Sequence, residues 1–217
     1  MRFALAVLIL FISINSFAQD PEFPDIRNKR DMFSRVQEKD IRADLASFTM
    51  GGIDESAGKL PLRHLPLTGI GKNYIQFEGN GIKVRIASTR FDASKHKLQY
   101  YTNPDTEKKY LTKIDFKPFF GDYGKIPVTQ IDSVTVLLGA DTIAIPKEAY
   151  FDLYNPIFSY SEDGAQKHIN NVYLSADGRK VYIYMLKREL GGSYEVTWVI
   201  QDKKYLKRVV DFGFLKD

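Results

Sequence analysis

The sequence predicts a mainly β protein, built as an antiparallel sandwich or half-open barrel with a short N-terminal helix and a C-terminal four-strand meander. Three observations support this fold class. Apolar residues alternate with polar ones from about residue 60 onward, turn residues recur about every eight to twelve positions, and the last part of the chain reads as four consecutive strands. With no repeat and no linker, residues 51–217 are expected to form one β-rich domain.

The first eighteen residues are typical of a cleavable secretory signal peptide. Arg2 precedes an apolar stretch over residues 3–14, and Ser16 and Ala18 supply the small side chains that signal peptidase prefers. Such a stretch forms a helix of about 18 Å, too short for a hydrocarbon core of about 30 Å, which disfavours an uncleaved anchor. We expect cleavage after Ala18 and a soluble protein in the periplasm or outside the cell, without an integral membrane segment.

The composition excludes several classes of function. The chain has no cysteine, which rules out thiol catalysis and cysteine-ligated zinc. Its formal net charge is +4, and acidic residues are interspersed with basic ones, whereas nucleic-acid binders concentrate basic charge on one face. We therefore expect no nucleic-acid partner.

Residues 19–50 form an N-terminal segment with a helix in this interpretation. Apolar residues three to five positions apart predict a helix that begins near Asp31. Residues 45–50 alternate as a strand would, so both alternatives stay open there, and Gly51-Gly52 ends either element. The periodic residues are Phe33, Val36, Ile41, Leu45 and Phe48.

Two hairpins are expected in the middle of the chain. Residues 74–77 and 82–86 flank Asn80-Gly81, a dipeptide that readily adopts the positive φ angles of a tight turn. Residues 130–138 and 142–145 repeat the arrangement. Further strand-like pieces at residues 97–101 and 110–114, and a short helical turn within residues 147–154, complete this region.

The C-terminal meander is the most regular prediction. Its strands cover residues 171–174, 180–188, 194–201 and 205–212. In the third strand Tyr194, Val196, Trp198 and Ile200 share one face, which should lie in the core, and Glu195 lies on the other face.

No catalytic, metal or nucleotide motif stands out in the sequence. His64, His96 and His168 lack metal-site spacing, and Gly-x-Ser-x-Gly and Walker-type motifs are absent. We therefore predict no catalytic residue, no metal ligand and no cofactor. A hydrolase with two carboxylates is the less favoured alternative, since such a pair needs only proximity in space. The acids in loops or at strand ends are Asp54, Glu55, Asp122, Asp132, Asp141, Glu162 and Asp163.

Residues 108–125 are the sharpest candidate for a binding site. Lysines are interleaved there with aromatic residues, whose rings stack on sugars while lysines attract phosphate, sulfate or carboxylate groups. This pattern favours a glycan or an anionic envelope polymer. In the alternative, the phenylalanines turn inward and close the end of the sandwich. The candidate binding residues are Tyr110, Lys113, Phe116, Lys117, Phe119, Phe120 and Tyr123.

A second candidate surface is formed by Tyr182 and Tyr184, which share one face of a strand. If that face is solvated, it suits a partner protein or a carbohydrate, and if it is covered, the tyrosines belong to the core. We expect a non-catalytic binding or structural module, with a protein-partner module as the alternative.

Overall fold

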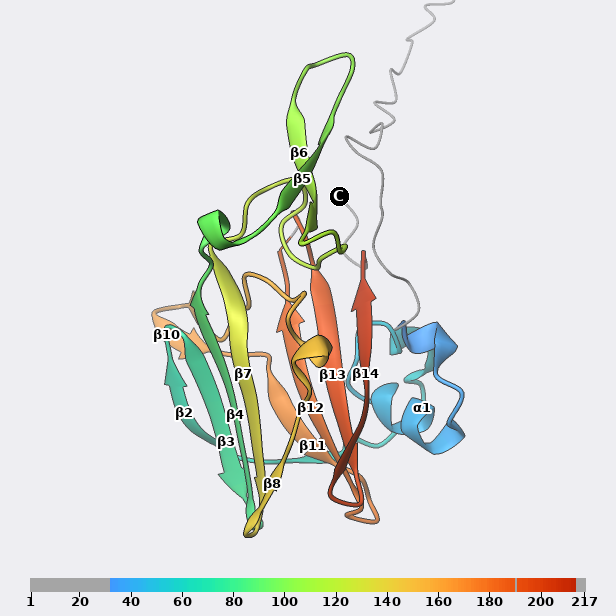
Figure 1. Ribbon diagram of the computed structural model, residues 1–217. Helices are drawn as coiled ribbons and strands as arrows, with labels where there is room; N and C mark the ends of the chain where they lie inside the picture. Colours follow the sequence, from blue (N-terminus) through green and yellow to red (C-terminus); the bar gives the residue numbers. More distant parts are fainter. Residues whose placement is uncertain (1–31, 190, 214–217) are drawn as a thin grey trace, which may run out of the picture.

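The computed structural model describes residues 32–189 and 191–213, so the predicted signal peptide lies outside the described residues. Two five-stranded antiparallel sheets face each other in a sandwich, which confirms the predicted fold class (Figure 1). The first sheet contains, in spatial order, β1 (Arg63–His64), β11 (Asn171–Leu174), β12 (Lys180–Lys187), β13 (Tyr194–Gln201) and β14 (Lys204–Phe212). The second contains β2 (Leu67–Gly71), β3 (Tyr74–Gly79), β4 (Ile82–Arg90), β7 (Thr129–Leu138) and β8 (Asp141–Ile143).

The predicted C-terminal meander forms the first sheet almost as expected. β13 turns Val196, Trp198 and Ile200 into the core between the sheets. The polar groups of the two large aromatic side chains on this face are hydrogen-bonded. Trp198 Nε1 donates to the carbonyl of Ala149 at 2.8 Å, and Tyr194 Oη donates to the carbonyl of Tyr154 at 3.0 Å. The meander therefore supplies one complete wall of the core.

The second sheet contains both predicted hairpins. β3 and β4 meet at Asn80 and Gly81, whose φ angles of 53° and 72° are those of a tight two-residue turn. β7 and β8 form the other hairpin, with β8 ending at Ile143. The helical turn expected nearby is the 3₁₀ helix η5 (Lys147–Ala149).

The N-terminal helix begins later than the spacing predicts. Residues 33–35 form a 3₁₀ turn, η2 (Phe33–Arg35), the backbone is extended at Val36 and Glu38, and α1 runs over Lys39–Leu45. A second 3₁₀ turn, η3 (Ile53–Glu55), follows. Phe33, Val36 and Ile41 nevertheless all pack on the sheet beneath them, as the apolar spacing requires.

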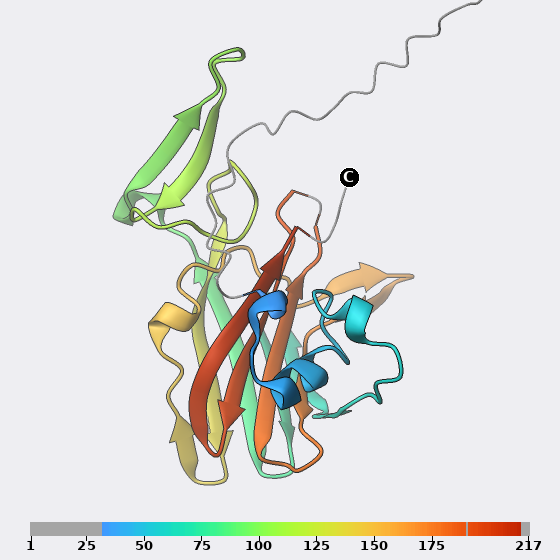
Figure 2. The same ribbon diagram turned by 90° about the vertical axis from the view of Figure 1, so that its right-hand side faces the viewer.

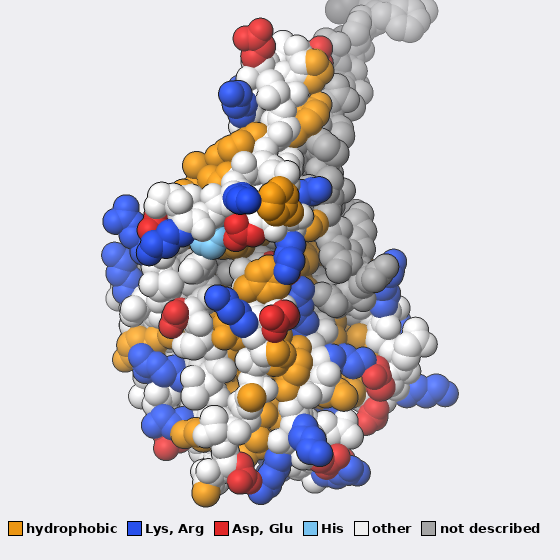
Figure 3. Space-filling model, viewed as in Figure 1, with side chains coloured by type: hydrophobic (Ala, Val, Ile, Leu, Met, Phe, Trp, Pro, Cys, Tyr) orange, Lys and Arg blue, Asp and Glu red, His pale blue; other side chains and the backbone are white. Residues whose placement is uncertain are grey.

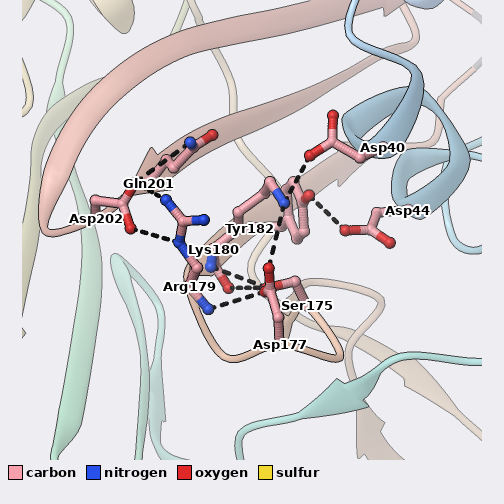
Figure 4. Close-up of polar contacts among 9 residues, drawn as sticks. All are labelled: Asp40, Asp44, Ser175, Asp177, Arg179, Lys180, Tyr182, Gln201 and Asp202. Carbon is pink, nitrogen blue, oxygen red and sulfur yellow. Dashed lines mark hydrogen bonds and ion pairs between the residues drawn. The ribbon is translucent and has the colours of Figure 1, made fainter.

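Residues 32–52, the N-terminal strap, cover the outer face of the first sheet (Figure 2). Tyr182 and Tyr184 are buried beneath it, at 0% and 4% exposure, so the second candidate surface belongs to the interior. Figure 4 shows α1 reaching this face: Asp40 lies 2.8 Å from Lys180 Nζ, and Tyr182 Oη donates to Asp44 at 2.6 Å.

Two small hairpins extend beyond the sandwich. β9 (Tyr160–Glu162) pairs with β10 (Ala165–Lys167) beside the second sheet. β5 (Leu98–Thr102) pairs with β6 (Lys109–Ile114) and projects from one end of the molecule (Figures 1 and 2). The base of this projecting hairpin is packed by a separate apolar cluster of Phe91, Leu111, Ile114, Phe119 and Tyr154.

Candidate binding site

The structure divides the predicted binding segment into buried and exposed residues. Phe119 and Phe120 are only 6% and 2% exposed. The ring of Phe119 packs edge-on against Tyr154, and that of Phe120 lies against Tyr194 and Phe212 in the core. These two phenylalanines close the end of the sandwich and offer no ring face to a ligand.

Tyr110 and Tyr123 are half-buried and position the loop that follows β6. Tyr110 packs on Gly124, where an added Cβ would lie 2.6 Å from Tyr110 Cδ1, and the φ angle of +70° also requires glycine there. The backbone N–H of Tyr123 donates to the carbonyl of Gly191 at 2.8 Å. Both tyrosines border the loop without forming its exposed surface.

Phe116 is the exposed aromatic residue of the segment. It is 61% exposed and occupies the second central position of a two-residue turn, in which Ile114 and Lys117 exchange backbone hydrogen bonds of 3.0 Å. Asp115 and Phe116 have φ angles of 50° and 66°. A bulky side chain rarely adopts this left-handed conformation, which costs about 1–2 kcal/mol. Backbone strain of this kind is concentrated at functional sites.

Asp115 fixes this turn to the residues that precede β5. Its carboxylate accepts hydrogen bonds from the backbone N–H of Lys97 at 2.9 Å and from His96 Nδ1 at 2.6 Å. These two bonds hold the pKa of Asp115 below its ordinary value. Because the His96 ring in turn stacks on the buried Phe91, at 4.6 Å between centroids, Phe116 is presented from a rigid base.

Lys97 lies at the exposed ring, whereas Lys117 lies over the ring of Phe151. Lys97 Nζ lies 5.4 Å from the Phe116 ring centroid, and Lys117 Nζ lies 4.5 Å from that of Phe151. Lys113 is half-buried on β6. Within residues 32–189 and 191–213, none of these three lysines forms an ion pair with a carboxylate. Figure 3 shows hydrophobic and basic side chains side by side at the base of the projecting hairpin.

We call Lys97, Asp115, Phe116 and Lys117 the turn platform. Sequence reasoning found Phe116 and Lys117 but missed Lys97 and Asp115, because only the pairing of Leu98 with Ile114 brings these positions together. The sequence did predict strand-like pieces at residues 97–101 and 110–114. Pairing these two pieces as a hairpin would have placed Lys97 close to Asp115.

Three of the predicted loop acids lie beside lysines. Asp122, Asp141 and Glu162 form ion pairs with Lys187, Lys203 and Lys167 respectively. Lys187 itself is completely buried and also contacts Glu189. Asp141 and Glu162 each have a lysine partner, whereas Asp122 and Glu189 share Lys187.

Two carboxylates that sequence reasoning did not pair, Glu195 and Asp211, are direct partners across β13 and β14. Glu195 accepts hydrogen bonds from the N–H groups of Met50 and Gly51, at 2.8 and 2.6 Å, and from Tyr184 Oη at 2.8 Å. Burial raises the pKa of both carboxyl groups. Since they lie beneath the N-terminal strap, they hold that strap and are closed to a substrate.

Neither a metal-ion cluster nor a membrane-spanning helix is found in the part of the chain that the structure describes. Across residues 32–189 and 191–213, no group of three or more His, Asp or Glu side chains is placed to hold a metal ion. In the same ranges, no helix has the length and apolar character needed to cross a membrane. Comparisons of the chain with protein-family models, with curated proteins and with solved structures find no match, and the function is therefore argued from the geometry of the turn platform.

Proposed function

We propose that the protein is an exported, soluble, non-catalytic binding module that holds an anionic glycan or envelope polymer on the turn platform. Phe116 carries the proposal, because it combines two unfavourable features that folding alone does not require. Its ring stays in water, and its backbone is strained. A ligand that stacks on the ring would compensate for both.

The chemistry of the surrounding residues indicates the class of ligand. An aromatic ring stacks on the C–H face of a sugar, and the ammonium groups of Lys97 and Lys117 attract carboxylate, sulfate or phosphate substituents. Asp115 stays ionised within the platform, so the attraction of the two lysines has to exceed its repulsion of an anion. An acidic polysaccharide satisfies both requirements along one chain.

The decisive experiment measures binding of the purified protein to alginate and to dextran sulfate, with neutral dextran as the reference polymer. Phe116→Asn removes the ring but suits the turn, because asparagine tolerates a positive φ angle. We expect F116N to fold normally and to weaken binding at least about tenfold, the effect of losing one stacked ring.

Two matched charge variants distinguish binding at the turn platform from nonspecific attraction of the polymer to a basic protein. K97Q/K117Q should weaken binding and reduce its salt dependence, whereas K59Q/K204Q, which removes two exposed lysines elsewhere, should leave it unchanged. Failure of the wild-type protein to bind either acidic polymer, or equal binding by F116N, would reject the proposal.

A protein partner is the second candidate, favoured by Ile126 and Val128. These side chains are 49% and 69% exposed, and the carbonyl of Val128 accepts a hydrogen bond from the backbone N–H of Phe91, whose ring stacks on His96. Exposed aliphatic side chains suit a protein interface better than a sugar. I126S/V128S should preserve polymer binding if the glycan is the partner.

A further inference from the structure

A cavity of about 640 Å³ lies beneath the β9–β10 hairpin, at a place separate from the turn platform. Its walls come from that hairpin, from the β2–β3 turn, from the loops on either side of the hairpin and from the residues that follow β12. Figure 1 shows β10 beside β2 and β3. The volume falls within the range of small-molecule sites in proteins, about 300–1,000 Å³. No residue lining it belongs to the platform.

The cavity has an apolar side and a charged side. Ile157, Phe158 and Ile169 form the apolar lining, and Tyr160 lies at the mouth with 39% of its surface exposed. Charged residues, Lys72, Glu162, Arg188 and Glu189, complete the lining, so the cavity offers both apolar and ionic contacts.

The charged side carries two acidic and two basic residues. Glu162 is paired with Lys167, and Glu189 shares the buried Lys187 with Asp122. Lys72 and Arg188 also line the cavity, and neither forms an ion pair with a carboxylate among residues 32–189 and 191–213. Two cations are therefore available to a ligand.

A completely buried asparagine holds the apolar lining in place. Asn170 donates its side-chain N–H groups to the carbonyls of Ile157 and Phe158, at 2.9 and 3.2 Å, and accepts from the N–H of Leu186 at 3.1 Å. These three bonds tie the loop to β12, next to Arg188. The apolar lining is thus positioned before any ligand binds, which lowers the cost of binding.

We infer that this cavity binds a small organic anion with an apolar body. The anionic group would lie between Lys72 and Arg188, whose planar guanidinium suits a carboxylate or sulfonate, and the apolar body would contact Ile157 and Ile169. This inference does not depend on the function proposed for the turn platform.

The test uses 8-anilinonaphthalene-1-sulfonate, whose fluorescence rises in an apolar environment, titrated into the purified full chain. We expect saturable binding of one dye per protein, and weaker binding, by about tenfold or more, in K72Q/R188Q, as expected for the loss of charge-assisted contacts. The uncharged dye N-phenyl-1-naphthylamine should bind the wild-type protein correspondingly less well. K59Q/R63Q serves as the matched charge control.

Two more variants locate the dye. Ile169→Trp keeps both cations but fills the cavity, and should abolish binding in a protein whose circular dichroism and melting temperature remain normal. F116N should bind the dye as the wild type does. Equal binding by K72Q/R188Q or by folded I169W, loss of binding in F116N, or no binding by the wild type would each overturn the inference.

Discussion

Phe116 combines an exposed aromatic ring with a left-handed backbone, and folding favours neither. Sequence reasoning could select it as an aromatic residue among lysines, but not separate it from Phe119 and Phe120, because exposure depends on which residue occupies the turn. The backbone hydrogen bonds between Ile114 and Lys117 place Phe116 in the turn, and no pattern in the sequence marks them.

The strain at Phe116 predicts a gain in stability when the residue is replaced. F116N should raise the free energy of unfolding by about 0.5–1 kcal/mol, because asparagine relieves the left-handed backbone while only the exposed contact with Lys97 is lost. Urea denaturation would measure this change. A loss of stability would mean that the ring serves the fold, and the functional argument would fail.

Glu195 predicts a dependence of stability on pH. Burial raises its pKa in the folded protein, so the folded state binds the proton more tightly than the unfolded state, and the free energy of unfolding should fall as pH rises above the ordinary value of 4.5. The groups that face it are Tyr184, Asp211 and the N–H groups of Met50 and Gly51.

The variant E195Q isolates this effect. It should flatten the fall of stability with rising pH, although Asp211, whose pKa is also raised, retains a smaller slope. Its overall stability should drop by about 1–3 kcal/mol, because an amide cannot accept from both backbone N–H groups as the carboxylate does. Denaturation curves between pH 4 and 8 would show an unchanged slope if Glu195 were not responsible.

The alternation of apolar and polar residues predicted where the strands lie, but it did not predict that the N-terminal strap covers the outer face of the first sheet. β11 and β13 have the bounds expected, because alternation and turn residues are local signals. That both faces of β12 and β13 are buried could not be predicted, since it depends on where the N-terminal strap lies. The strap itself was misread, as a helix from Asp31, because extended and helical pieces share its apolar spacing.

The N-terminal strap should therefore contribute strongly to stability but not to ligand binding. Ile41 is 1% exposed and packs on the outer face of the first sheet, so Ile41→Ala should cost about 2–5 kcal/mol. Below the melting transition, the affinity for alginate should equal that of the wild type. A change in affinity would show that the strap and the turn platform are coupled.

Over the whole molecule, the fold follows from the sequence more fully than the candidate site does. The sandwich needs only two sheets with apolar inner faces, and many substitutions would preserve it. The turn platform needs residues from two separated segments in one arrangement, fixed by Asp115 and by the pairing of β5 with β6. Contacts of that kind leave almost no trace in a single sequence.

Trp198 gives this protein a built-in optical reporter. It is the sole tryptophan of the chain, it is fully buried, and its indole N–H is hydrogen-bonded to Ala149. Its emission, excited selectively over that of the tyrosines, should be blue-shifted in the native protein and move to the red only when the sandwich opens. A ligand on the turn platform should leave it unchanged, so one spectrum distinguishes a variant that has lost its partner from one that has lost its fold.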